Sequence, residues 1–217
     1  MNLRVRYMDV RVKFKDDNES WVYDSNDPHS RKNALGYESL PGNTLEVRLN
    51  PATGQVLNVR GGETIYRILG RDDLAGEANS IFLDRFNQEL YIYADGPLDI
   101  GQQWTRTFNV AAPYGLQYVH TFTLEKHKKK QGFLKRESQI STGMMPGNLY
   151  ADNRKFSLTG TQTAELNVDL ESGIIYGLVA HTELKGQQKM PAGPGRENPV
   201  KTPIQVKIDL ISEMSMK

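Results

Sequence analysis

Apolar and polar residues alternate along most of this chain. Leu45, Val47 and Leu49 are separated by charged residues, and the segment 156–170 keeps one apolar phase for fifteen positions. A period of two turns one face of a strand toward a core and the other toward solvent. The pattern therefore predicts about ten β-strands. Their ranges are 3–14, 21–23, 45–49, 57–59, 104–110, 116–124, 133–140, 156–170, 174–180 and 204–210.

Two irregularities interrupt this alternation. Apolar residues from Leu3 to Tyr7 share one phase, whereas those from Met8 to Phe14 share the other, and we interpret the slip as a β-bulge. The longest predicted strand contains Gly160, which permits a kink, so we expect that strand to bend there without ending.

Helical spacing replaces the alternation in one region only. A short helix fits Ile65, Ile68 and Leu69. A longer helix is predicted by apolar residues at four-residue intervals, and Asn79 or a residue before it is expected to cap its start. The apolar residues of the longer helix are Ala78, Phe82, Phe86 and Leu90.

Short turns join most of the strands, which favours antiparallel neighbours. The predicted fold class is α+β and mostly β. We expect one large curved, half-barrel-like antiparallel sheet with the two helices inserted after the second hairpin and packed on its apolar face. The chain is predicted to be a single domain over residues 1–217, with a helical insertion at 61–94 and a loop rich in proline and glycine at 186–203.

Composition narrows the function classes. The chain has 217 residues, a net charge of +1 and 38% hydrophobic residues, which argues against a disordered chain and against a dedicated nucleic-acid binder. It contains no cysteine, which excludes thiol nucleophiles, disulfides and zinc sites built on thiolates. No apolar run is long enough for a transmembrane segment, and the first residues alternate as a strand does instead of forming a signal peptide.

Motifs with a defined catalytic mechanism are missing. The chain lacks the nucleophile elbow, the paired-histidine zinc motif and the glycine-rich phosphate loops, so we predict that it is not an enzyme and holds no metal or cofactor. His120 shares its strand face with apolar residues and is expected to be a hydrogen-bonded core histidine. A hydrolase assembled from the distant residues His181, Glu183 and Asp169 is the catalytic alternative.

Charge is unevenly spread along the chain. Residues 71–103 carry two basic and seven acidic side chains, whereas residues 104–136 carry seven basic and one acidic. Lysines dominate the predicted hairpin from Lys126 to Arg136, and we interpret them as solvated residues that keep a hairpin tip soluble. An anionic partner such as lipid headgroups is the alternative, and nucleic acid is not expected because aromatic and arginine side chains are scarce there.

Four stretches carry a resemblance to a known family. They are Tyr23-Asp24-Ser25, the turn at 50–56, the segment 95–104 with its Gly-Pro-Leu and Trp104, and the segment 169–175. In this order they resemble an uncharacterised family, a domain of unknown function, of bacterial exported proteins and lipoproteins. The resemblance implies an architecture similar to that of periplasmic lipoprotein carriers, in which a curved sheet and helices enclose an apolar cavity.

The expected function is that of a non-catalytic extracytoplasmic binding protein. An apolar ligand or a lipidated partner would lie between sheet and helices, in the periplasm or at the outer membrane. The alternative is a structural or interaction module of the cell envelope that holds no small ligand. The helical insertion has more apolar residues than one helix stripe requires. We therefore predict that the ligand contacts are Phe82, Phe86, Leu90 and Trp104.

Overall fold

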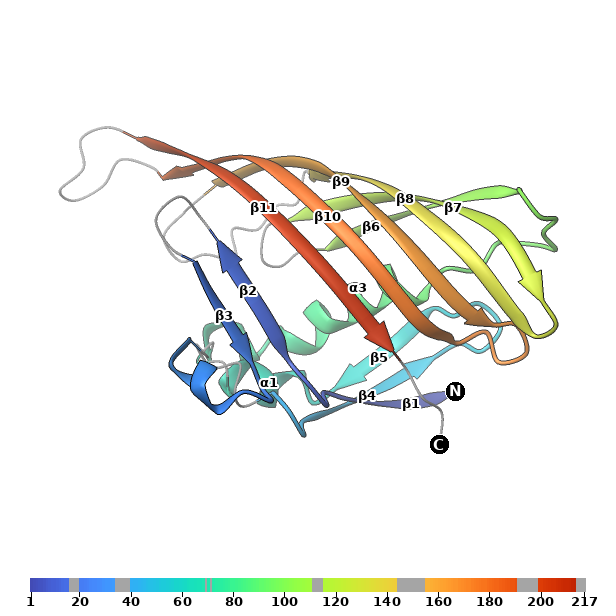
Figure 1. The fold of residues 1–217 in the computed structure, drawn as a ribbon, viewed down its shortest axis with the longest axis horizontal. Coiled ribbons are helices and arrows are strands. Elements are labelled where there is room, and N and C mark those ends of the chain that lie inside the picture. Colours follow the sequence, from blue (N-terminus) through green and yellow to red (C-terminus); the bar gives the residue numbers. More distant parts are fainter. Residues whose placement is uncertain are drawn as a thin grey trace. The chain divides into compact units, whose positions relative to one another are not determined.

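The computed structural model describes residues 1–15, 20–33, 40–68, 70, 72–110, 115–143, 155–190 and 199–213. The described chain is mostly β, as predicted, and its strands pair antiparallel (Figure 1). They lie in three sheets, so the expectation of one large ten-stranded sheet is wrong. The chain divides into two compact units, Met1–Phe86 and Asn87–Lys217. The single domain over residues 1–217 stays a prediction.

The first unit contains a three-stranded and a two-stranded sheet. The larger sheet has the order β1-β4-β5, with β1 at Asn2–Arg6, β4 at Thr44–Leu49 and β5 at Val56–Arg60. The smaller sheet pairs β2, at Arg11–Lys15, with β3, at Ser20–Asp24, and the 3-10 helix η1 follows at Pro28–Asn33.

The predicted bulge near Tyr7 is instead the end of a strand. β1 pairs with β4 and β2 pairs with β3, so the two phases of the N-terminal pattern belong to different sheets. Between them, the Tyr7 N–H donates to the carbonyl of Asn43 at 3.1 Å, and the Val10 N–H donates to the Ser25 hydroxyl at 2.9 Å. These bonds satisfy the backbone where the chain changes sheets.

Three α-helices follow in the described chain. α1 spans Gly62–Ile68 and α3 spans Ala78–Leu90, which confirms the two predicted helices, although Leu69 lies outside the described residues. A short helix, α2 at Asp72–Ala75, was not predicted.

Asn79 caps a different helix from the one expected. It lies inside α3, and its Oδ1 accepts a hydrogen bond from the N–H of Gly62, the first residue of α1, at 3.0 Å. Asn79 therefore does not cap α3, whose start at Ala78 leaves a residue before Asn79, the other expected position, for that cap. The Asn79 side chain thus satisfies a free N–H group at the start of α1, although Asn79 itself belongs to α3.

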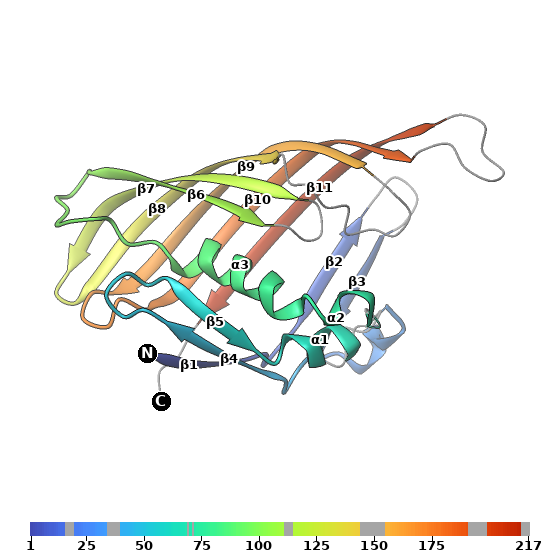
Figure 2. The same cartoon turned by 180° about the vertical axis from the view of Figure 1, so that it is seen from behind.

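The second unit contains a six-stranded sheet whose strands follow one another in sequence order from β6 at one edge to β11 at the other (Figure 2). All neighbours are antiparallel, which confirms the inference from the short turns. The last two strands extend into the range of the predicted loop at 186–203, of which residues 191–198 lie outside the described chain. The strands are β6 Gln103–Val110, β7 Leu116–Lys128, β8 Gln131–Thr142, β9 Lys155–Asp169, β10 Ile175–Met190 and β11 Val200–Glu213.

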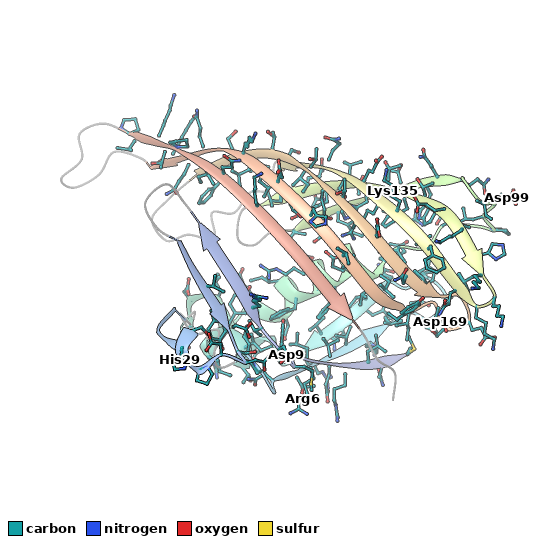
Figure 3. The ribbon with its side chains drawn as sticks, in the orientation of Figure 1. Arg6, Asp9, His29, Asp99, Lys135 and Asp169 are labelled. Carbon is teal, nitrogen blue, oxygen red and sulfur yellow. The ribbon has the colours of Figure 1, made fainter. Side chains whose placement is uncertain are left out.

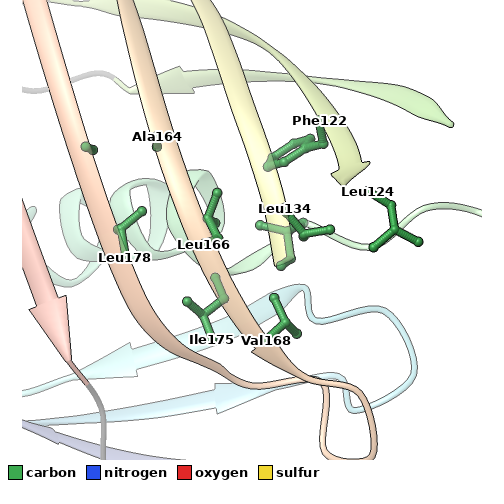
Figure 4. Packing of buried hydrophobic residues seen from close by; sticks show 10 residues of the cluster. Phe122, Leu124, Leu134, Ala164, Leu166, Val168, Ile175 and Leu178 are labelled. Carbon is green, nitrogen blue, oxygen red and sulfur yellow. The ribbon is translucent and has the colours of Figure 1, made fainter. Parts of the chain in front are cut away.

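Alternation gives this sheet an inner face with two separate apolar clusters. The large cluster draws most of its buried side chains from β7 to β10, and Figure 4 shows eight of them labelled on neighbouring strands. The small cluster has its buried residues at Leu116, Ile140, Leu158 and Leu184. The large cluster comprises Ile92, Phe122, Leu124, Leu134, Ala164, Leu166, Val168, Ile175, Leu178 and Ala180.

β9 and β10 approach each other too closely for side chains at two positions. A Cβ atom added at Gly160 would lie 1.9 Å from the carbonyl oxygen of Glu183, and one at Gly186 would lie 1.9 Å from that of Ser157. The strand runs unbroken through Gly160, as predicted. The glycine is required there because the neighbouring backbone occupies the place of a side chain.

We expect Gly160→Ala to lower the free energy of unfolding by about 3 kcal/mol, because the methyl group can be accommodated only if the two strands move apart. Gly96→Ala is the matched control, since no atom lies within 4 Å of its Cβ position, and it should change stability by less than about 0.5 kcal/mol. Urea unfolding followed by circular dichroism measures both. Equal stabilities for the two variants would contradict the close approach.

Candidate functional site

A row of polar side chains crosses the inner face of the six-stranded sheet. The strand register places Arg106 opposite His120, His120 opposite Ser138, Ser138 opposite Gln162, and Gln162 opposite Thr182. We call these five residues the polar row. On one side of these residues, Phe122, Ala164 and Ala180 lie two positions away and belong to the large cluster. On the other side, Ile140 and Leu184 lie two positions away and belong to the small cluster, against which Tyr118 packs. The polar row separates the two apolar parts of the inner face.

Arg136 lies beside the polar row and is completely buried. Its Nη1 donates to Glu89 Oε2 at 3.1 Å, and its Nη2 donates to Gln162 Oε1 at 2.8 Å. Gln162 in turn donates through Nε2 to the hydroxyl of Thr182 at 2.8 Å. A buried guanidinium is tolerated only with such partners, and the carboxylate of Glu89 balances its charge.

His120 is also completely buried. Its Nδ1 lies 2.7 Å from the Ser138 hydroxyl, which confirms the prediction of a hydrogen-bonded core histidine. The rings of Phe108, Tyr118 and Phe122 surround it at centroid distances of 5.4, 5.6 and 5.8 Å. Burial, helped by the positive charge of Arg136, lowers the pKa of His120 from 6.5 to about 3, so the ring is neutral at pH 7.

Three buried nitrogen atoms near this row have no hydrogen-bond partner among the described residues. They are Arg106 Nε, His120 Nε2 and Arg136 Nε. Arg106 is otherwise well bound, since its Nη2 lies 2.7 Å from both the carbonyl of Tyr93 and the carboxylate of Asp95. Buried polar atoms are usually satisfied, so three of them in two adjacent rows mark a place where a bound group could be held.

Arg136 is the functional residue that sequence reasoning missed. It lies in the predicted lysine-rich hairpin, on β8, but its side chain is buried and not solvated as expected of that hairpin. Arg136 shares its strand phase with Leu134 and Ile140, both of which are buried, so the alternation in β8 was the signal that could have found it. Its neighbour Lys135 behaves as expected: it lies in the body of β8 with its side chain half-exposed and pairs with Glu137 at 2.8 Å (Figure 3).

The four predicted ligand contacts form two pairs, one in each unit. Phe82 and Phe86 stack in the first unit with ring centroids 6.2 Å apart. Leu90 and Trp104 pack against the large cluster in the second unit, where the Trp104 ring stacks on Phe122 at 5.3 Å. Their shared role as ligand contacts stays a prediction.

Two residues of the hydrolase alternative, His181 and Glu183, are exposed and two positions apart on the same face of β10, but Asp169 does not lie near them. Glu183 lies exposed on β10 and pairs with Lys207 at 2.7 Å, a contact that lowers the pKa of its carboxyl. Asp169 ends β9 and accepts backbone hydrogen bonds in the turn that follows (Figure 3). Glu183 is opposite Thr161, eight positions before Asp169 along β9, which corresponds to roughly 26 Å.

Within the described part of the chain, no three His, Cys, Asp or Glu side chains are placed to hold a metal ion. None of the described helices combines the length and the apolar character that a membrane span requires.

Comparison with known proteins gives one result. A family model described as "Family of unknown function (DUF6263)" matches residues 1–175. This match confirms the expected resemblance to a family of unknown function. Neither the search of curated proteins nor the search of solved structures found a match.

We expect the free energy of unfolding to fall by about 2 kcal/mol between pH 7 and pH 5 because of His120. Its pKa is 6.5 in the unfolded chain and about 3 in the folded one, so only the unfolded chain gains a proton in this range. The neutral ring makes its whole contribution to the free energy of unfolding above pH 6.5, and this contribution is lost as the pH falls toward 3. Urea unfolding at both values measures it.

His120→Gln is the control, because glutamine stays neutral at both pH values while other groups titrate as before. The variant should be less stable at pH 7 but should lose less stability on acidification than the wild type. The same loss in both proteins would show that His120 is not the group responsible.

Proposed function

Because this chain belongs to the DUF6263 family, whose function is unknown, we propose its function from the polar row and the clusters beside it. It is a non-catalytic binding protein that holds a molecule with an apolar chain on the inner face of the six-stranded sheet. The observation that carries this proposal is the set of three buried nitrogen atoms that lie next to apolar surface and have no partner among the residues described. Few convergent polar groups amid apolar side chains are typical of small-molecule sites.

The small cluster is the best surface for the apolar chain. Its buried residues are flanked by three partly buried hydrophobic side chains, Tyr118, Phe156 and Ile204. All its members, buried and partly buried, come from strands of the sheet. They adjoin the polar row directly, because Tyr118 is two positions from His120 on β7. A ligand could therefore contact apolar and polar groups at once.

The chemistry of the site supports a binding role over a catalytic one. The contact between Ser138 and His120 resembles that of a nucleophile with its base. Burial holds the pKa of His120 at about 3, too low for a base that works near neutral pH. Its second ring nitrogen has no orienting partner among the described residues, unlike the base of a catalytic triad.

We propose that the protein works outside the cytoplasm, in the periplasm or at the outer membrane. The support is the resemblance of its four motif stretches to exported bacterial proteins and lipoproteins. Fractionation of the natural host tests this proposal, and recovery of the protein with the cytoplasmic fraction would contradict it.

We expect the purified protein, after removal of bound lipid, to bind a fluorescent fatty-acid probe saturably and with a blue-shifted emission. Phe156→Ala should weaken this binding about tenfold, because it removes apolar contact area from the small cluster. Fluorescence titration measures both affinities.

Val179→Ala is the matched control, since Val179 is 39% exposed and alternates with Leu178 and Ala180, which point inward. It should bind the probe as the wild type does. If the wild type binds no probe, the binding role is wrong and the envelope interaction module without a small ligand takes its place. Equal losses in both variants would place the probe elsewhere.

A further inference from the structure

The lysine-rich hairpin that joins β7 to β8 lies at one end of the six-stranded sheet. Residues 124–133 contain four lysines and one glutamate, and all four lysines are exposed. Lys129 has a positive φ of 53° and lies in the turn between the two strands. Lysines that only keep a strand end soluble need no particular neighbours, so the residues around the hairpin decide what it can bind.

Two exposed apolar side chains flank this hairpin. On the β6 side, Ile100 is 58% exposed, and the N–H of the next residue, Gly101, donates to the carbonyl of Leu124 at 2.7 Å. On the β9 side, Leu170 is 50% exposed, and its N–H donates to the carbonyl of Lys130 at 2.7 Å. These bonds fix both residues beside the hairpin. One end of the sheet thus combines exposed positive charge with exposed apolar surface.

The acidic side chains of the neighbouring turn are already engaged. Glu171 pairs with Lys130 at 2.7 Å, and the carboxylate of Asp169 accepts hydrogen bonds from two N–H groups of its own turn. Lys128 and Lys129 form no ion pair within the described part of the chain. Their charges therefore stay available to a partner.

Other acidic residues limit the positive region to the turn itself. Glu125 precedes the lysines on β7, and Asp99 lies in the loop before β6, at the same end of the sheet (Figure 3). The positive charge is therefore concentrated at the turn and is not spread over the whole end. A partner must contact the turn closely to be attracted by it.

We propose that this end of the sheet docks on a membrane surface that contains anionic lipids. Lysines close to such a surface are attracted by its negative potential, and each strengthens binding about fivefold. Ile100 and Leu170 then enter the boundary between head groups and acyl chains, which removes their side chains from water. An acidic protein would match the lysines, but it would not require exposed apolar residues on both sides of them.

The docking surface is separate from the polar row. Lys128 is eight positions from His120 along β7, which corresponds to roughly 26 Å. Membrane docking therefore does not depend on the ligand binding proposed for the inner face. Either of the two can be wrong while the other is correct.

Sedimentation with lipid vesicles tests the proposal. The wild type should bind vesicles of phosphatidylglycerol and phosphatidylcholine in equal parts about tenfold more tightly than vesicles of phosphatidylcholine alone. Added salt should weaken this binding, because it screens exposed charges. Equal binding to both kinds of vesicle, or binding to neither, would contradict the proposal.

Lys128→Gln should weaken binding to the mixed vesicles about fivefold, because it removes one charge from the hairpin. Lys201→Gln is the matched control, since Lys201 is also exposed on a strand of this sheet but lies at its other end, opposite Lys189 near the end of β10. It should bind as the wild type does. Equal affinities of the two variants would show that the hairpin is not the docking surface.

Leu170→Ala should weaken the same binding about threefold, because less apolar surface enters the lipid. Leu57→Ala is its control, since Leu57 is exposed to a similar extent, 47%, but belongs to the first unit. If these two variants bind equally well, the lysines recognise charge alone, as they would on an acidic protein, and membrane docking is wrong. Circular dichroism confirms that all four variants are folded.

Discussion

The burial of a positive charge at Arg136 is the constraint on which the second unit depends. A guanidinium taken out of water must find fixed partners, and here they come from Glu89 in the last turn of α3 and from Gln162 on β9. Gln162 extends the network to Thr182 on β10. One charge thus links a helix end to β8 and β9, and Gln162 extends the link to β10. A register slip of β9 against β8 would separate Arg136 from Gln162.

The same network gives the inner face its chemical character. If every row of the inner face were apolar, the face would form one continuous hydrophobic core. The polar row divides that face into a large and a small cluster, and at the division Arg106 Nε and His120 Nε2 have no hydrogen-bond partner in the part of the chain that the structure describes. Such atoms lower stability. The ligand that we propose would supply partners for them.

Much of the fold follows from local patterns. Alternation located the six strands of the second unit, because every second side chain of a strand meets the same face, and the four-residue spacing located α3. The alternation in β7 also predicted that the side chain of His120 is buried. The pattern at the N-terminus was interpreted wrongly because a change of phase marks equally well a bulge or a change of sheet, and only the partner strand distinguishes them.

The sequence by itself determined the strands, their antiparallel order and the inward direction of His120, since these depend on neighbours close in the chain. The alternation in β8 also indicates that Arg136 points inward, but the nearby lysines led us to predict a solvated segment. Tertiary structure alone decided the division into three sheets and the partners of Arg136. Glu89 is 47 residues away from it and Gln162 is 26, and no local pattern records which distant side chains a buried charge will meet.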